Sequence, residues 1–229
     1  AHDVLLDGND GGIWKSTNNG GNWSDLTAGL PAGDSRNINQ MEIDPTNSNN
    51  LWLSTEAGLY KSANGGTSWN FQDLTGIGTQ FTVSRASVDP GNSNMVIVPS
   101  IATSNTDVAA SVSGIYRTMD GGVTWRQIVS NEKLRSVYLI RNGSNLVMWA
   151  ASNGHFNESM QSSAGVYLCS NPFGDVVQEM ACREIKRGLT NLNNVSFEEN
   201  GSQSRVLRAS TEGGGIFDYR RVFLGPDFN

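Results

Sequence analysis

A short motif occurs three times in this chain and constrains its fold more than any other feature of the sequence. Each copy has a hydroxyl residue, Asn or Asp two positions later, Gly four positions later and Trp seven positions later. Asn and Gly tolerate the positive φ of tight hairpin turns, and an Asn or Asp side chain can accept hydrogen bonds from N–H groups of its own turn. Each copy therefore predicts a β-hairpin whose motif residues are structural. These residues are Ser16, Asn18, Gly20 and Trp23; Ser62, Asn64, Gly66 and Trp69; and Thr118, Asp120, Gly122 and Trp125.

A short strand pattern of Gly, an aliphatic residue and an aromatic residue precedes each turn and recurs five times. The aromatic residues stand at positions 14, 60, 116, 167 and 217, so successive copies are 46 to 56 residues apart. This period is close to the length of one four-stranded propeller blade. A second pattern of strand, polar turn and strand comes earlier in the units, at 43–53 and 88–97 and more weakly at 140–147 and 197–202. The order in a unit is therefore strand A, polar turn, strand B, strand C, turn motif and strand D.

The turn motif resembles the Asp-box, also called the BNR or sortilin-like repeat, which reads Ser-x-Asp-x-Gly-x-x-Trp. Asp120 matches strictly, whereas Asn18 and Asn64 replace the Asp but keep its acceptor oxygen. Similar repeats occur in sialidases, sortilin-type receptors, xyloglucan-active hydrolases and secreted bacterial propellers. The resemblance implies an all-β protein, a β-propeller of four-stranded antiparallel blades. It also implies a secreted or cell-surface protein that acts as a recognition or scaffold module.

The number of repeat units does not determine how the propeller closes. The units span approximately 1–34, 35–80, 81–130, 131–188 and 189–229, which gives about 4.5 to 5 blades. The chain is then a piece of a larger propeller, a small five-bladed ring, or a ring that closes with another chain. A complete propeller usually has four to eight blades, and an open sheet edge invites pairing with a partner strand.

Composition agrees with an all-β repeat protein and argues against several partners. The 229 residues are 37% hydrophobic and 17% charged and include 26 Gly, which suits a protein rich in turns. The net charge of −6 and the absence of a Lys/Arg run argue against nucleic acid, and no apolar run is long enough to span a bilayer. We expect no cofactor, and as partners a carbohydrate, another protein chain, further blades of the same parent protein, or a second copy in a homo-oligomer.

The two cysteines, Cys169 and Cys182, flank the segment 170–177 that replaces the turn motif in the fourth unit. Adjacent antiparallel strands can bring them close enough to form a bond. We expect a disulfide, which implies an oxidising compartment; two buried free thiols are the alternative. Two Cys with this spacing and two His do not make a zinc site, so we expect no metal.

Five Asn-x-Ser/Thr sequons permit glycosylation if the source glycosylates secreted proteins, although an Asn- and Ser-rich chain contains several by chance. Asn142 and Asn200 lie in predicted surface turns and are the best candidates, followed by Asn157 and Asn194. Asn22 lies in a tight turn and is the least suitable.

A hydrolase is the alternative function. Sialidases, which share the Asp-box, need an arginine triad and an Arg-Ile-Pro segment that this chain lacks. Xyloglucan-active hydrolases are more similar, because they place an Asp before strand C in a stretch like 9–12, Asn-Asp-Gly-Gly. The resemblance makes Asp10 the candidate catalytic acid or base. Glycoside hydrolysis also needs a second carboxyl group, roughly 5 to 10 Å away.

Other candidate ligand-binding residues gather at the predicted rim formed by the B–C connections. Glu56 and Glu212 occupy the positions equivalent to Asp10 in later units, although such acids can simply cap the turns. His155 lies in 152–164, which, like 103–113, lengthens a B–C connection. Trp52 and Trp149 lie on B strands, where they form either exposed platforms for sugar stacking or part of the core.

Overall fold

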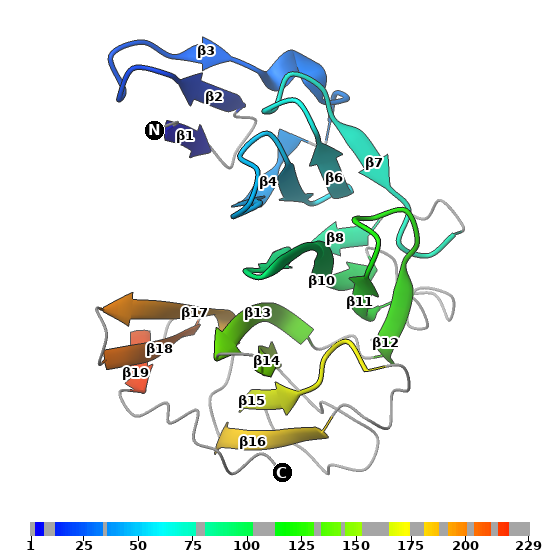
Figure 1. Ribbon diagram of the computed structural model, residues 1–229, viewed down its shortest axis with the longest axis vertical. Coiled ribbons are helices and arrows are strands. Elements are labelled where there is room, and N and C mark those ends of the chain that lie inside the picture. The colour runs from blue at the N-terminus through cyan, green and yellow to red at the C-terminus, as the bar shows by residue number, and fades with distance from the viewer. Residues whose placement is uncertain are drawn as a thin grey trace.

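The computed structural model describes the chain as five antiparallel sheets that follow one another in sequence. The residues described are 3–6, 12–33, 36–76, 81–102, 113–130, 134–142, 145–152, 165–174, 181–187, 192–200, 204–211 and 215–219. The sheets are arranged side by side along an arc, as Figure 1 shows. We call them blades 1 to 5. The structure confirms the all-β architecture of several antiparallel sheets that the repeat predicts.

Each blade is an up-and-down sheet whose strands follow chain order. Blade 1 contains β1 (Asp3–Leu6), β2 (Ile13–Ser16) and β3 (Ser24–Asp25), and blade 2 contains β4 (Ile38–Ile43), β5 (Leu51–Thr55), β6 (Gly58–Ser62) and β7 (Asn70–Gln72). Blade 4 contains β13 (Leu134–Asn142), β14 (Asn145–Ser152), β15 (Gly165–Ser170) and β16 (Ala181–Arg187). Blade 5 contains β17 (Leu192–Asn200), β18 (Ser204–Thr211) and β19 (Gly215–Tyr219).

Blade 3 departs from the four-stranded pattern. Its strands are β8 (Phe81–Val83), β9 (Ser87–Asp89), β10 (Asn92–Ala102), β11 (Gly114–Thr118) and β12 (Arg126–Ser130). Both β8 and β9 pair with the long strand β10, so the innermost position is filled by two short strands separated by residues 84–86. This interruption leaves Arg85 outside a regular strand on the inner side of the sheet.

The first strand of blades 2 to 5 lies on the inside of the arc and the last strand of blades 1 to 4 on the outside (Figure 1). The described residues also contain one short 3-10 helix, η1 (Thr27–Gly29), after β3. No helix of the described part is long and apolar enough to cross a membrane.

The hydrophobic core lies between the blades and not within a single sheet. Three buried clusters join blades 1 and 2, blades 2 and 3, and blades 3 and 4. In each cluster an aliphatic residue of one blade packs with the aromatic residue of the next blade's equivalent strand: Ile13 with Tyr60, Leu59 with Tyr116, and Ile115 with Tyr167. Each fully buried large side chain contributes roughly 1.5–3 kcal/mol. The recurring Gly-aliphatic-aromatic pattern is therefore the sequence signal of blade stacking.

The turn motif forms the same hydrogen bonds in all three copies. In the third, the Thr118 hydroxyl accepts from the Gly122 N–H (2.8 Å) and donates to Asp120 Oδ1 (2.7 Å). Asp120 also accepts from the N–H and hydroxyl of Thr124 (2.9 and 2.6 Å), and these bonds lower its pKa to about 2. Ser16 with Asn18 and Ser62 with Asn64 make the equivalent bonds. Asn replaces Asp because the turn needs only one acceptor oxygen at this position.

The fourth unit keeps the turn without the motif. Cys169 takes the position of the hydroxyl residue, Asn171 has a φ of 51°, and the Gly174 N–H donates to the Asn171 carbonyl (3.1 Å). Phe173 is buried in the core between blades 3 and 4, where Trp69 and Trp125 pack in the preceding interfaces. Cys169 is fully buried and is the direct register partner of Cys182 in β16. Partners across antiparallel strands have Cα separations within the range that a disulfide spans, so the disulfide remains our proposal for this pair.

Candidate functional site: the inner strands of blades 2 to 4

Of the acidic residues expected at the B–C rim, only Glu56 can be placed. Asp10, Glu212 and His155 lie outside the described residues. Glu56 occupies the exposed two-residue turn between β5 and β6, where its carboxylate accepts from Asn37 Nδ2 (3.0 Å). Its N–H donates to the Asn37 carbonyl, and its own carbonyl accepts from the Thr82 hydroxyl of blade 3. Glu56 thus ties its turn to its surroundings.

Of the two alternatives for Trp52 and Trp149, the exposed platform is wrong and the core position is correct. Each side chain is only 1% exposed, and both belong to the core. Trp52 packs edge-to-face against Trp125 of the next blade with ring centroids 5.9 Å apart, and Lys61 Nζ lies 5.0 Å from its centroid. A B strand lies in the middle of its sheet, and neighbouring blades cover both of its faces. These two positions are therefore unavailable for stacking against a sugar.

The structure places three of the five sequons on strands and Asn22 in the turn between β2 and β3, while Asn157 lies outside the described residues. Asn142 is the last residue of β13 and Asn200 the last residue of β17, each at the end of a hairpin. Asn194 lies inside β17, opposite Ser210. The two hairpin ends remain the proposed glycosylation positions.

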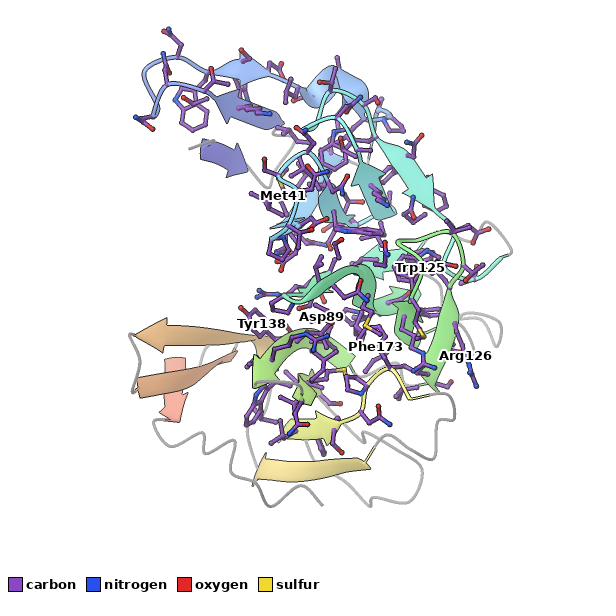
Figure 2. All side chains as sticks on the ribbon, in the orientation of Figure 1. Met41, Asp89, Trp125, Arg126, Tyr138 and Phe173 are labelled. Atoms are coloured by element: carbon purple, nitrogen blue, oxygen red, sulfur yellow. The ribbon has the colours of Figure 1, made fainter. Side chains whose placement is uncertain are left out.

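The inner strands hold a group of polar side chains that the sequence patterns did not reveal. Gln40 and Glu42 come from β4, Arg85 from the interruption between β8 and β9, and Tyr138 from β13; we call these four residues the inner polar cluster. Arg85 Nη2 lies 4.0 Å from Glu42 Oε2, and the Arg85 guanidinium carbon lies 4.6 Å from the Tyr138 ring centre. The labelled Tyr138 lies on the inner side of the arc in Figure 2. Arg85 thus connects three blades.

Burial dominates the electrostatics of this cluster. It raises the pKa of Glu42, against the opposing effects of the Arg85 charge, a hydrogen bond from Gln40 and one from the Val88 N–H. These three partners offset part of the cost of burying the carboxylate. Glu42 and Arg85 nevertheless remain 22% and 15% exposed at their side chains.

Two buried atoms of the cluster have no hydrogen-bond partner among the described residues: Arg85 Nε and Gln40 Oε1. The Gln40 amide is held in place because its nitrogen donates to the Met41 carbonyl (2.7 Å) and to Glu42 Oε2 (2.9 Å), which are both acceptors. Its oxygen must then point elsewhere. A buried unsatisfied donor or acceptor costs about 1–3 kcal/mol. The cluster therefore contains one buried donor and one buried acceptor, and a hydrogen bond to either of them would be favourable.

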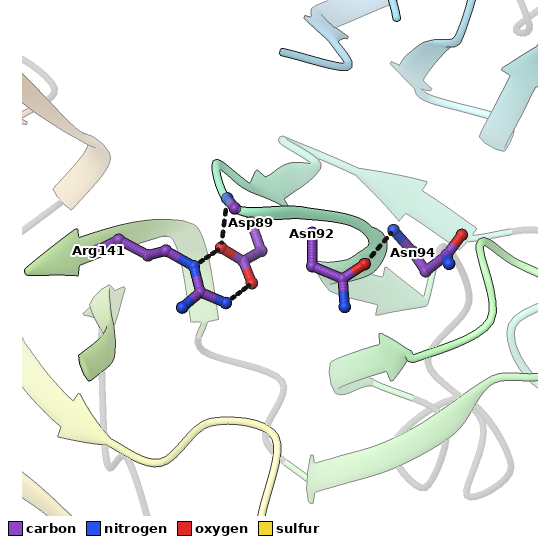
Figure 3. A network of polar contacts seen from close by, with 5 residues as sticks. Asp89, Asn92, Asn94 and Arg141 are labelled. Atoms are coloured by element: carbon purple, nitrogen blue, oxygen red, sulfur yellow. Dashed lines mark hydrogen bonds and ion pairs between the residues drawn. The ribbon is translucent and has the colours of Figure 1, made fainter. Parts of the chain in front are cut away.

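A second charged pair on the inner strands is structural. Arg141 of β13 forms a bidentate ion pair with Asp89 of β9, with both N–O distances 2.6 Å (Figure 3). The Asp89 side chain is fully buried and also accepts from the Gly91 N–H (2.9 Å). The hydrogen bonds to Asp89 raise the pKa of Arg141. In blade 2 the equivalent Asp44 instead accepts from Thr46 and Asn50 within its own turn.

Arg141 stands at the position that Asp44 and Asp89 occupy in the preceding units. An Asp at the end of one inner strand thus meets an Arg at the end of the next. This pair fastens blade 4 to blade 3. No group of three or more His, Cys, Asp or Glu side chains that could hold a metal lies within the described ranges.

Comparisons with known proteins support the fold and leave the activity undefined. No protein-family model and no curated protein matches the chain. The extracellular domain of a B. thetaiotaomicron protein described as a one-component system is similar, with a TM-score of 0.61 and 13% identity over 94% of this chain and 25% of that chain. The GH74 enzyme of Niastella koreensis is also similar (TM-score 0.54, 19% identity, 92% of this chain and 34% of that one).

An ancestral GH74 enzyme gives a TM-score of 0.51 at 14% identity, over 94% of this chain and 36% of the other. The chain thus spans about a quarter to a third of the length of the solved structures that it resembles. Identities this low show the fold alone. The chain shares the propeller fold with glycoside hydrolases and with the extracellular domain of the protein described as a one-component system.

Proposed function

We propose that this chain is an extracellular recognition module, part of a larger propeller, that binds carbohydrate hydroxyl groups at the inner polar cluster. The supporting observation is the unpartnered pair of atoms, Arg85 Nε and Gln40 Oε1, beside the Glu42 carboxylate. By contrast, the carboxylates of Asp120 and Asp44 accept hydrogen bonds from residues of their own turns.

A hydroxyl group is a suitable complement, because it can donate to Gln40 Oε1 or accept from the Arg85 Nε–H. Both atoms are buried, so binding requires the side chains of the cluster to move and admit the ligand. A neighbouring hydroxyl of the same sugar can donate to Glu42. A purely anionic ligand fits less well, because the negative charge of Glu42 lies 4.0 Å from Arg85 and would repel it.

An extracellular location is part of the proposal. It is supported by the similarity to an extracellular domain and by the register of Cys169 with Cys182, which would bond in an oxidising compartment. A scaffold role in contact with another protein chain is compatible with the same fold.

The test uses Arg85→Lys, which keeps the positive charge beside Glu42 but removes the Nε–H of the guanidinium group. Arg126→Lys, an exposed residue on the outer strand β12, is the matched control. The wild type is screened against an array of neutral and acidic oligosaccharides, and hits are titrated by calorimetry. We expect Arg85→Lys to weaken binding about tenfold, the effect of losing roughly one hydrogen bond, and Arg126→Lys to have no effect.

Equal affinities of the two variants, or no binding to any oligosaccharide, would refute this assignment. The same samples distinguish the hydrolase alternative. Turnover of β-glucan oligosaccharides that Asp10→Asn abolishes would favour a glycoside hydrolase over a recognition module.

A further inference from the structure

Asparagine followed by glycine is a reactive pair, because the main-chain nitrogen of the glycine can attack the asparagine side chain. Glycine favours this attack because its main chain turns freely and carries no side chain that hinders the approach. The sequence contains such pairs at Asn19, Asn64, Asn142, Asn153 and Asn200. For the pairs 19–20 and 64–65 the structure describes both residues. These two pairs look equally reactive in the sequence, so a difference between them must come from the structure.

The pair that begins at Asn64 is held on both sides of the reacting bond. Asn64 Oδ1 accepts from the Ser62 hydroxyl (2.9 Å) and the Ser68 N–H (3.0 Å), and Asn64 Nδ2 donates to the Ser68 hydroxyl (2.9 Å). The next residue, Gly65, is buried, and its N–H donates to the Asn49 carbonyl (2.9 Å). The side chain and the attacking nitrogen must therefore both leave their partners before they can meet.

Asn19 has fewer restraints. Its side chain is exposed, and neither its side chain nor its N–H forms a hydrogen bond with another residue of the described part. It stands at the turn position that Gly65 and Gly121 fill in the other copies and shares their positive φ (56° against 68° and 71°), which is uncommon for a residue with a side chain. The next residue, Gly20, is exposed, and its N–H donates to the Ser16 hydroxyl within the same turn (2.8 Å).

We infer that Asn19 is a deamidation site of the folded chain, whereas Asn64 is protected. The Gly20 nitrogen attacks Asn19 Cγ, the new C–N bond closes a succinimide ring, and Nδ2 leaves as ammonia with the proton from the Gly20 nitrogen. Water then opens the ring at either of its carbonyl carbons, which gives aspartate or isoaspartate. The reaction consumes water, releases ammonia and needs no further reactant. This inference does not depend on the carbohydrate-binding role proposed above.

The reaction changes the first hairpin turn in two ways. Both products add a negative charge to it. Isoaspartate also adds a carbon atom to the main chain between Asn18 and Gly20. This lengthens the turn that the bond from the Asn22 N–H to Asn18 Oδ1 (2.7 Å) closes, so we expect isoaspartate to break that bond.

The first experiment follows both pairs in the unmodified chain. The chain is incubated at about pH 8, once folded and once in concentrated guanidinium chloride, and is then digested for peptide mass analysis. Mass separates the amide from the acids, and chromatographic retention separates aspartate from isoaspartate. We expect similar rates at Asn19 and Asn64 in denaturant. In the folded chain we expect Asn19 to convert about tenfold faster, because Asn64 must first give up three side-chain hydrogen bonds.

Equal rates at the two sites of the folded chain would overturn the inference, since both would then react through a common opening of the fold. Intact Asn19 in the folded chain, at a time when the denatured chain has converted, would also overturn it.

The second experiment weakens the protected pair. Ser62→Ala removes one of the hydrogen bonds to Asn64, so it should speed the conversion of Asn64 and leave that of Asn19 unchanged. Thr17→Ala, an exposed change in the first turn, is the control and should alter neither rate. Circular dichroism checks that both variants are folded. An unchanged rate at Asn64 in folded Ser62→Ala would show that these hydrogen bonds do not protect it and would contradict the inference.

Discussion

The ion pair between Arg141 and Asp89 gives the sharpest prediction about stability. Arg141→Leu leaves the Asp89 carboxylate, which is fully buried, with the Gly91 N–H as its remaining contact shown here. Two charge-assisted hydrogen bonds of 2.6 Å are lost. Removing one partner of a buried pair typically costs about 3–5 kcal/mol, because the other charge stays unpaired. Since Arg141 is 31% exposed and water can enter in its place, we expect about 3 kcal/mol, the low end of that range.

The measurement is urea unfolding followed by tryptophan fluorescence, with the apparent free energy of unfolding taken from the midpoint and slope. Arg126→Leu on the exposed part of β12 is the control and should change this free energy by less than about 0.5 kcal/mol. Asp89→Asn combined with Arg141→Leu should recover part of the loss, because no buried charge then remains. A cost below about 1 kcal/mol for Arg141→Leu, or no recovery in the double variant, would refute the reasoning.

Three further predictions follow from the turns. The pKa of Asp120 is lowered to about 2, so its carboxylate should stabilise the fold above about pH 4 and lose this contribution as the pH falls toward 2. Asp120→Asn, which matches Asn18 and Asn64, should remove that part of the pH dependence of the melting temperature. An unchanged pH profile of the melting temperature would contradict this prediction. Gly122→Ala should destabilise the fold by about 1–3 kcal/mol more than Gly33→Ala. Both glycines have positive φ (96° and 92°), but a Cβ at Gly122 would lie 2.8 Å from the Trp52 ring, whereas nothing lies within 4 Å of a Cβ at Gly33. Equal melting temperatures of the two variants would argue against the close packing. If Cys169 and Cys182 are bonded, non-reducing mass analysis should find no alkylatable thiol, and two alkylated thiols would reject the disulfide.

The turns could be predicted from the sequence because their hydrogen bonds are local. Ser62 reaches Asn64 and Gly66 within four residues, so spacing alone identifies the contact. The inner polar cluster could not be predicted in this way. Arg85 and Glu42 belong to different repeat units, and a repeat shows which positions are equivalent but not which side chains meet across an interface.

Arg141 shows the same limit. In the sequence it looks like a degenerate copy of Asp89 in a weaker polar turn, whereas in the structure it is the partner of that residue, 52 positions away. Trp52 and Trp149 also lie on strands whose apolar character is visible, but burial on both faces depends on the neighbouring blades. One signal was available in retrospect: Gln40 and Glu42 are polar residues at alternate positions of the same strand.

The central claim, that the inner polar cluster binds a ligand through its unpartnered atoms, can be tested directly by NMR. The Nε–H resonances of Arg85 and Arg126 can be followed in a ¹⁵N spectrum while an oligosaccharide that the array selects is added. The account predicts a shift of the Arg85 resonance that saturates with the binding curve, together with an unmoved Arg126 resonance. Saturable binding that leaves the Arg85 resonance unchanged would place the ligand elsewhere and contradict the account.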